Sequence, residues 1–346
     1  MKKYICMLLI LCLSVLSAAC NNKLPQPVKS EDFALGTIID QDVYGANAQK
    51  ASVEVFAKIK ELDALWTINS PGGDINKLND HAGLGYVELK PETITILNEA
   101  RKISDLSSGA AFDITVAPLV KAWGIGTDHP RLPADNVVKQ LVSLVNYKDI
   151  IIDQATNSAA LQKKGQMVDL GGIAKGYIGD IVTDIYKKNG ITSAVANLGG
   201  NVVVLGSKPD GSPWKIGIQN PRSETSDIVG VVEVTDKAVV TSGDYQRYFI
   251  EDGKRYCHII DPRTGYPIDS GLMSVTIIAS SSADADGLAK AIVLGLDKGM
   301  ELVKNYGKAE AIFITADKKI FVTPGLEDKF RLEDASHEYT YVQNGG

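Results

Sequence analysis

Helical and strand periodicities alternate along most of the chain, and this alternation limits the fold more than any other feature of the sequence. Apolar residues recur every three or four positions in 48–66, from Pro91 to 103, and in 172–189, which predicts three amphipathic helices. Asn47 is expected to cap the first helix, and Gly190 is expected to end the third. An all-α or an all-β fold is therefore excluded.

Short β-branched runs, separated by Gly, Pro and Asp, predict strands around a fourth helix at 283–296. Asp252-Gly253 is the strongest hairpin signal in the chain. No repeat and no linker interrupt residues 31–330. We therefore predict an α+β (mixed α/β) fold in a single compact unit of two interwoven subdomains. The predicted strands are 192–198, 202–205, 214–219, 228–234, 238–241, 248–251, 254–260, 274–279, 311–315 and 320–323.

The charge balance argues against a polyanion-binding surface. The 346 residues contain 36 Lys and Arg against 42 Asp and Glu, a formal net charge of −6, so we expect no nucleic-acid partner. Hydrophobic residues make up 45% of the chain, which is enough for a large core.

The first residues are typical of a targeting segment. Two lysines precede an apolar run that is too short to span a bilayer comfortably, and the run ends in Leu-Ser-Ala-Ala-Cys at 16–20. This ending resembles the lipobox of bacterial lipoproteins. It implies that residues 1–19 are a signal peptide, that Cys20 is lipidated, and that residues 20–30 tether a protein facing the periplasm or the cell exterior. An ordinary secretory signal is the alternative.

One cysteine stays in the folded part. The lipobox resemblance implies that Cys6 and Cys12 leave with the leader and that Cys20 is acylated, so Cys257 is expected to have no internal disulfide partner. Because Cys257 lies in an alternating apolar run, we predict a buried strand thiol rather than a nucleophile.

A glycine-rich segment, Asp-Leu-Gly-Gly-Ile-Ala-Lys-Gly-Tyr at 169–177, leads from a strand end into a helix. Uncovered amides at a helix start favour anions, and Lys175 adds a cation, so a phosphate is a natural ligand. The Walker and Rossmann spacings are absent. A tight structural turn is the alternative.

Four further segments combine turn residues with polar groups. Asn-Leu-Gly-Gly-Asn at 197–201 and Thr-Ser-Gly-Asp-Tyr at 241–245 could each be simple turns. The turn at 258–267 carries more titratable groups than a turn requires. At 283–291, two carboxylates either cap a helix or bind a hard cation such as Mg²⁺. The candidate residues in these segments are Gly199, Gly200, Asp244, His258, Asp261, Arg263, Asp284 and Asp286.

Together these segments resemble the ApbE family, the FAD:protein FMN transferases of bacterial lipoproteins, over about residues 31–325. The resemblance rests on six motifs in the family's order: SGAAFDITVAPL at 108–119 with Trp-Gly at 123–124, DLGGIAKGY, NLGGN, SGDYQRY, HIIDPRTGYP and ADGLAKA. It implies an ApbE-like transferase domain at 31–330, followed by a C-terminal tail at 331–346.

The resemblance implies a Mg²⁺-dependent enzyme with FAD as its substrate. Such enzymes attach FMN through a phosphoester to a Thr or Ser hydroxyl and release AMP. The acceptor flavoproteins carry a D-G-x-[ST]-G-[AS]-[ST]-like motif, as in subunits of sodium-pumping or Rnf-type respiratory complexes. The runner-up functions are a periplasmic FAD pyrophosphatase and a non-catalytic flavin-binding lipoprotein.

The family pattern assigns Mg²⁺ to the backbone carbonyl of Ala174, the carboxylate of Asp286 and the side chain at position 290. Lys290 stands here where Thr is common, and an ammonium cannot ligate a metal. Lys290 is therefore expected to neutralise phosphate directly and to take part in catalysis.

Other roles follow from the same resemblance. The flavin-facing positions are Leu35 and Thr37, and the adenosine and ribose contacts are Asp113 and Thr115. His258 and Asp261 are both candidates for activating the acceptor hydroxyl.

Overall fold

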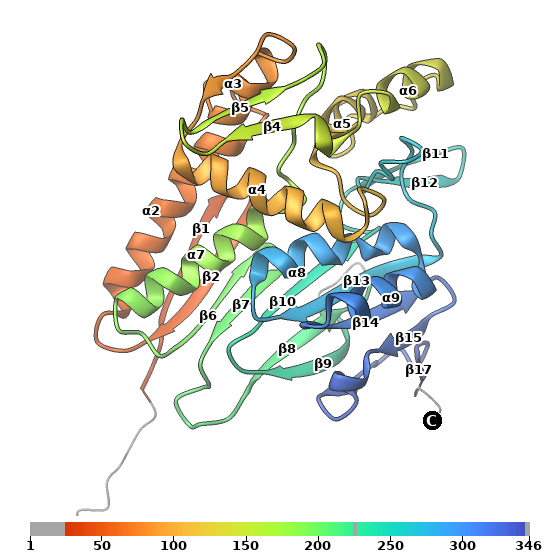
Figure 1. The fold of residues 1–346 in the computed structure, drawn as a ribbon. Coiled ribbons are helices and arrows are strands. Elements are labelled where there is room, and N and C mark those ends of the chain that lie inside the picture. The colour runs from red at the N-terminus through yellow and green to blue at the C-terminus, as the bar shows by residue number, and fades with distance from the viewer. Residues whose placement is uncertain (1–24, 224–226, 343–346) are drawn as a thin grey trace, which may run out of the picture.

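The computed structural model describes residues 25–223 and 227–342, and its largest element is a nine-stranded sheet (Figure 1). Every neighbouring pair in the sheet is antiparallel except β15 and β17, which run parallel. Across the sheet the strands are β1 (Val28–Ala34), β2 (Thr37–Tyr44), β6 (Ser193–Leu198), β7 (Asn201–Leu205), β10 (Ala238–Gly243), β13 (Leu272–Ala279), β14 (Ala309–Thr315), β15 (Lys319–Val322) and β17 (Thr340–Val342).

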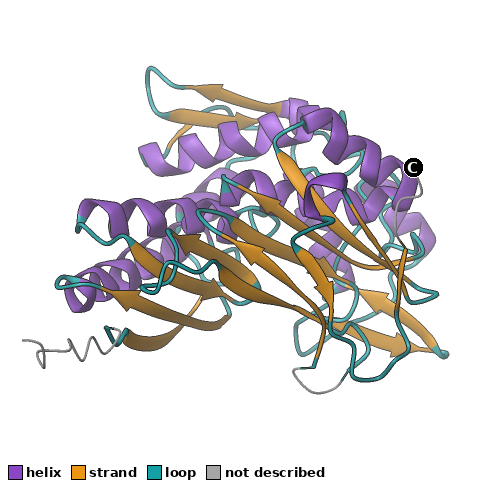
Figure 2. Ribbon diagram, turned by 90° about the horizontal axis from the view of Figure 1, so that it is seen from below, coloured by secondary structure: helices purple, strands orange, loops and turns teal. Residues whose placement is uncertain are grey.

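Helices cover one face of this sheet (Figure 2). The nearest are α7 (Ala174–Lys188) and α8 (Ser282–Leu288), which pack on each other and on β7 and β10. Helix α2 (Ala48–Trp66) packs on β1 and β2, and α4 (Pro91–Leu106) packs on α8. Helix α2 buries the stripe that its sequence predicts: Ala48, Ala51, Val55, Ile59, Leu62 and Trp66.

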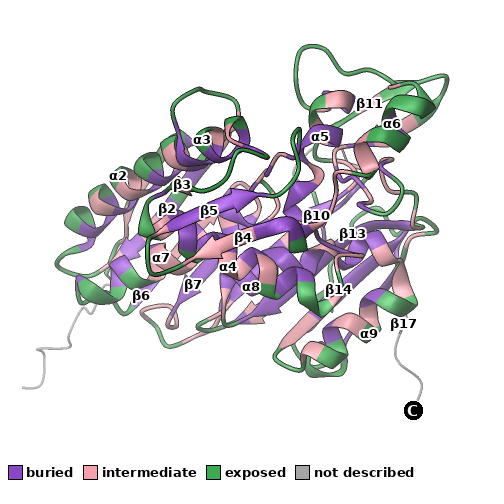
Figure 3. Cartoon of the chain, turned by 45° about the horizontal axis from the view of Figure 1, so that its top comes forward, coloured by how far each residue is buried: buried purple, intermediate pink, exposed green. Residues whose placement is uncertain are grey.

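A smaller sheet covers the other face. Its strands are β8 (Trp214–Gln219), β9 (Ile228–Val234) and β16 (Phe330–Leu332), and their apolar residues form a second core with Ile312 and Ile320. Because the main sheet is covered on both faces, β13 is buried at every position instead of alternating. Figure 3 shows this contrast between buried central strands and exposed outer helix surfaces.

A third group of elements gathers at the top of Figure 1. They are the sheet of β3 (Val87–Glu88), β5 (Ser158–Leu161) and β4 (Ile150–Asp153), helices α3 (Asp74–Asp80), α5 (Ala117–Trp123) and α6 (Asp135–Val142), and the hairpin of β11 (Tyr248–Glu251) and β12 (Lys254–Cys257). Trp123 joins segments far apart in sequence, since its indole N–H donates to the carbonyl of Gly265 at 2.8 Å and its ring stacks on Tyr256. The chain is one compact α+β unit.

The predicted helix at 283–296 is in fact three elements. Helix α8 ends at Leu288, a 3-10 helix continues from Ala289 to Leu294, and α9 (Leu296–Tyr306) starts after Gly295. Gly295 has a φ of +80°, which breaks the helical path. The predicted strand 254–260 likewise ends at Cys257, and only Ile260 bridges onward, to Pro267.

One local prediction is wrong. The Asn47 side chain does not cap α2; it donates to the carbonyl of Asn189 at 2.9 Å and so joins α2 to the end of α7. Capping of α8 by Asp284, the alternative to a cation site, is not seen, because the Ser281 hydroxyl accepts the bond from the Asp284 amide. Gly190 does follow α7 with a φ of +73°, as expected of a helix-ending glycine.

The predicted boundaries of the folded region are too narrow. Strand β1 starts at Val28, inside the predicted tether. The predicted tail provides part of β16 and all of β17, and Tyr339 between them is buried and bonded to Asn220. The predicted tail is polar and shows little periodicity, so its strands are recognised only from their pairing in the structure.

The predicted leader and the lipidated Cys20 lie outside the described residues. Within the described part of the chain, no helix has both the length and the apolar character needed to cross a membrane.

Cys257 is buried, as predicted, and burial raises the pKa of its thiol to about 11. We expect Cys257→Ser to keep most of the FAD turnover that the family resemblance implies, because a protonated, buried thiol is a poor nucleophile. Steady-state rates of the folded variant check this. Complete loss of turnover with an unchanged circular dichroism spectrum would contradict it.

Candidate functional site

Three segments that are distant in sequence meet at the carboxylate of Asp286, which is 2% exposed. Its Oδ2 accepts the amide of Gly176 and the side-chain amide of Asn201, both at 2.9 Å. Its Oδ1 accepts the ammonium of Lys290 at 3.1 Å. Three nitrogen donors therefore already surround this carboxylate.

Two glycines of α7 allow α8 to come close enough for this arrangement. A Cβ on Gly176 would lie 2.4 Å from the carbonyl oxygen of Ser282 and 2.5 Å from the Asp286 Cβ. A Cβ on Gly179 would lie 2.5 Å from the Ser282 hydroxyl. Asp180, on the same helix, accepts the amides of Ser282 and Ala283 and so fixes the start of α8. The glycines of this motif thus serve helix packing as well as the site.

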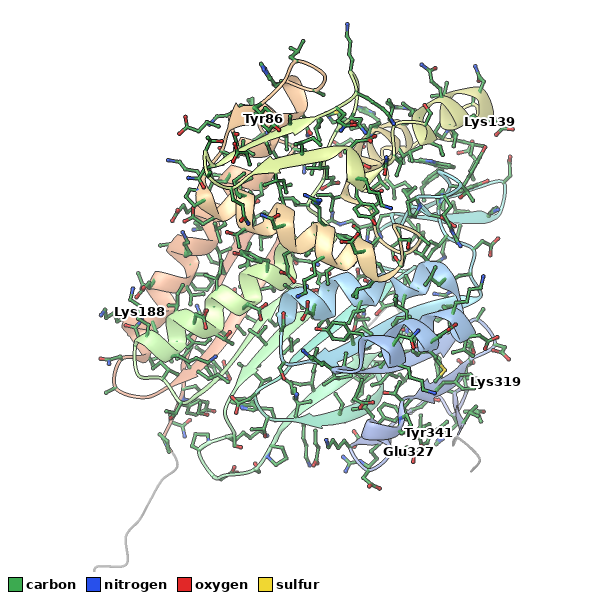
Figure 4. All side chains as sticks on the ribbon, in the orientation of Figure 1. Tyr86, Lys139, Lys188, Lys319, Glu327 and Tyr341 are labelled. Carbon is green, nitrogen blue, oxygen red and sulfur yellow. The ribbon has the colours of Figure 1, made fainter. Side chains whose placement is uncertain are left out.

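The ammonium of Lys290 is enclosed by oxygen atoms. One helical turn beyond Asp286, it contacts that residue's Oδ1 and also its backbone carbonyl at 3.0 Å. It further contacts the hydroxyl of Ser242, at 3.1 Å, on the neighbouring strand β10. The Lys290 side chain is only 15% exposed. In contrast, the labelled lysines in Figure 4 point outward from the molecule.

Lys175 extends the same network on its other side. Its ammonium donates to the side-chain oxygen of Asn201 at 3.3 Å, and Asn201 in turn donates to Asp286. Burial lowers the pKa of Lys175, although the nearby Asp286 carboxylate acts to raise it. Two lysines thus flank one buried carboxylate, which leaves an excess of positive charge for a bound anion.

Arg247 is the third cation here, and the sequence analysis did not single it out. Its guanidinium lies near Gly36, 3.5 Å from where a Cβ would stand, and its side chain also passes Gly126. Its backbone carbonyl accepts the amide of His258 at 3.0 Å. The SGDYQRY motif contains it, but only the fold reveals that this arginine faces the other two cations.

His258 adjoins all three cations. The pKa of its imidazole is lowered to about 4, mainly by burial and to a smaller extent by the positive charges of Lys290, Arg247 and Lys175. Its Nδ1 is buried and has no hydrogen-bond partner among the described residues. The ring is therefore neutral near pH 7 and able to accept a proton.

Asp261 and Arg263, predicted beside His258, are paired with each other. The guanidinium donates to both carboxylate oxygens of Asp261, at 2.9 and 2.7 Å. The Arg263 amide also donates to this carboxylate, so the pair closes the turn. No hydrogen bond joins Asp261 to His258 within the described ranges. The geometry thus favours His258 over Asp261 as the proton acceptor.

The predicted flavin-facing turns lie side by side. Leu35 has a φ of +55°, and its amide donates to Asp63 at 2.8 Å. Gly199 has a φ of +62° and packs so closely on Thr37 that a Cβ there would lie 2.5 Å from the Thr37 side chain. Gly200 follows with a φ of +93°. Glycine is required at 199 both by this backbone conformation and by the close contact.

The other predicted ligand contacts already have protein partners. Asp113 accepts the amide and hydroxyl of Thr115 and the amide of Tyr147, and burial raises the pKa of its carboxyl. Asp244 forms a two-point ion pair with Arg222, with both distances 2.7 Å. To bind the nucleotide as predicted, Asp113 and Asp244 would have to contact it while keeping these bonds within the protein.

The predicted magnesium ligands do not fit a protein-held ion. Position 290 is an ammonium that occupies one oxygen of Asp286, and two amides occupy the other. Asp284 points elsewhere, because its carboxylate accepts Lys102 and the hydroxyl of Tyr306. The described residues contain no cluster of three or more His, Cys, Asp or Glu able to hold a metal. Of the predicted set, only the Ala174 carbonyl and one lone pair of Asp286 are left.

A separate cavity of about 550 Å³ opens between the small sheet and strands β13 and β14. Glu233, Lys237, Ile278, Glu310 and Lys329 are among the residues that line it. None of the predicted site residues lines this cavity, and the cation cluster is on the helix-covered face of the sheet. The two features are therefore independent.

Comparison with known proteins agrees with this architecture. The ApbE family model matches residues 35–313. An FAD:protein FMN transferase of Klebsiella pneumoniae is 33% identical over 305 residues, covering 88% of this chain and 94% of its own. One of Treponema pallidum is 32% identical over 322 residues, covering 88% and 89%. The crystal structure of the ApbE protein of Thermotoga maritima superposes with a TM-score of 0.78 at 30% identity, covering 90% of this chain and 98% of that one.

Proposed function

The chain belongs to the ApbE family, and from this premise we propose that it is an FAD:protein FMN transferase. The reaction transfers FMN from FAD to a Thr or Ser hydroxyl of an acceptor flavoprotein, forms a phosphoester and releases AMP. The observation that carries the proposal is the buried imidazole of His258, whose Nδ1 has no hydrogen-bond partner among the described residues and which lies near Lys175, Arg247 and Lys290. A proton acceptor beside cations suits attack of a hydroxyl on a diphosphate.

The bonds change in one displacement. The acceptor oxygen forms a bond to the FMN phosphorus, and the bond from that phosphorus to the bridging oxygen breaks. AMP leaves with the bridging oxygen, and the imidazole of His258 takes the hydroxyl proton. Phosphoryl transfer of this kind depends on positioning and on charge stabilisation more than on covalent catalysis.

Lys175 and Arg247 would hold the diphosphate oxygens and stabilise the charge that collects on AMP as it leaves. Lys290 would add its positive charge from nearby, because Ser242 and Asp286 already accept its three N–H groups. Leu35 and Thr37, with the turn at Gly199 and Gly200, would pack against the flavin. Asp113 and Thr115 would meet the adenosine at the other end.

The family resemblance also implies Mg²⁺ dependence. Because the side chains present do not fit a protein-held ion, no step of the proposed reaction runs through one. The family resemblance also implies the acceptor class: flavoproteins with a D-G-x-[ST]-G-[AS]-[ST]-like motif, as in sodium-pumping or Rnf-type complexes.

Intact mass spectrometry tests the proposal. The protein is incubated with FAD and an acceptor that carries the motif, and the acceptor should gain the mass of FMN less one water while AMP appears in equal amount. An acceptor whose last motif hydroxyl is replaced by alanine is the control. Free FMN and AMP with an unmodified acceptor would establish the FAD pyrophosphatase instead, and bound but intact FAD would establish a flavin-binding lipoprotein.

We also propose that Cys20 is lipidated and holds the enzyme on a membrane, facing the periplasm or the cell exterior. The leader and the Leu-Ser-Ala-Ala-Cys ending support this. Cys20→Ser should move the protein from the membrane fraction to the soluble fraction, because the attached acyl chains provide the membrane affinity. Immunoblots of both fractions check this, and an unchanged membrane fraction would refute lipidation at Cys20.

A further inference from the structure

The ammonium of Lys290 is bound as a cation in a small oxygen cage. Its three contacts, to Asp286 Oδ1, to the Asp286 carbonyl and to the Ser242 hydroxyl, lie between 3.0 and 3.1 Å. These are oxygen ligands of the kind that a hard divalent cation also selects. A solvated helix lysine would instead keep its ammonium in water.

The helix geometry brings the Lys290 side chain to this position. Residues 286 and 290 are one helical turn apart on the same side. The side chain runs past Gly172, where its Cε lies 3.3 Å from where a Cβ would stand. The Asp286 side chain is 3% exposed, so the ion pair is shielded from competing water.

From this geometry we infer that Lys290 permanently occupies the cation position beside Asp286 and replaces a divalent metal ion there. The protein then binds no Mg²⁺ of its own through Asp286. Toward the diphosphate, the ammonium provides part of the charge neutralisation that a bound metal ion would give. This part of the inference rests on the proposed function. Ser242 and Asp286 position that ammonium.

A metal ion cannot share the carboxylate with this ammonium. An ion on Asp286 Oδ1 would lie at about 2.1 Å from it, hence within about 5 Å of the Lys290 nitrogen. Like charges at that distance inside a water-poor site repel strongly. The other oxygen offers no alternative, since Gly176 and Asn201 both donate to it.

Binding of Mn²⁺, measured by electron paramagnetic resonance without any nucleotide, tests the inference. The purified protein is titrated as wild type, Lys290→Thr and Lys290→Thr/Asp286→Asn. Lys298→Thr, which changes an exposed lysine on α9, is the matched control. We expect the wild type and the control to leave Mn²⁺ free, and Lys290→Thr to bind one ion at least ~10-fold more tightly. The double variant should lose that gain.

Two results would overturn the inference. One is a wild-type protein that binds one Mn²⁺ and loses it on Asp286→Asn. The other is equal Mn²⁺ binding by the wild type and a folded Lys290→Thr. Circular dichroism confirms folding, and Lys290→Gln replaces Lys290→Thr if that variant does not fold. The Mn²⁺ titration contains no FAD, so its outcome does not depend on whether the protein transfers FMN. Failure of the metal inference can therefore be distinguished from failure of the proposed function.

Discussion

Replacing Asp286 with alanine should abolish FMN transfer and destabilise the fold. The change leaves the buried ammonium of Lys290 without its counter-charge and removes the acceptor for Gly176 and Asn201. Breaking a buried ion pair from one side costs about 3–5 kcal/mol of unfolding free energy. The loss of a positioned charge in the site should reduce turnover by at least ~10²-fold.

Urea unfolding curves and FAD turnover measure the two effects. Glu301→Ala, which removes an exposed carboxylate of α9, is the matched control and should change the unfolding free energy by less than about 0.5 kcal/mol. Asp286→Asn keeps the shape of the side chain, so it should restore much of the stability while turnover stays low. An Asp286→Ala protein with near-normal stability and rate would show that the network has no role.

Replacing His258 with glutamine should cause the second large loss, in turnover of FAD. A general base contributes about 10²–10⁴-fold to the rate, and glutamine cannot accept the hydroxyl proton. FAD binding should change much less, because the three cations stay in place. Single-turnover rates with bound FAD check this; a decrease below about threefold would assign the proton to another group.

The same variant should change how stability depends on pH. The folded pKa of His258 is about 4, below its ordinary value of 6.5, so the unfolded chain takes up the proton first as the pH falls. The contribution of His258 to the free energy of unfolding is therefore fully present above pH 6.5. It decreases by about 3 kcal/mol as the pH falls to 4. The difference in unfolding free energy between wild type and His258→Gln should therefore shrink by that amount between pH 7 and pH 4. A difference that is independent of pH would contradict the burial of a neutral imidazole.

Much of the fold could be predicted because local physics and tertiary structure agree there. Strands β8, β9 and β11 have the bounds that their β-branched runs predict, and α2 buries its predicted stripe. The local patterns did not predict helix α3 or strands β3, β4 and β5. The seven residues of α3 make about two helical turns, which is too few to establish a helical period.

The sequence by itself also indicated which segments meet at the candidate site. The motifs containing Lys175, Asn201, His258 and Asp286 stand out because glycines and polar groups interrupt an apolar rhythm. Their separation along the chain hides how they meet: Asn201 and Asp286 are 85 residues apart, yet they share a hydrogen bond.

Only the tertiary structure decided what each polar residue is bound to. It paired Asp261 with Arg263 and turned Asp284 toward Tyr306, and it placed the ammonium of Lys290 on Asp286. The physical reason is that a buried charge must find its partner among whatever groups the packing of α7, α8 and the sheet brings near it. The spacing of residues along the chain does not show which group becomes the partner of each buried charge.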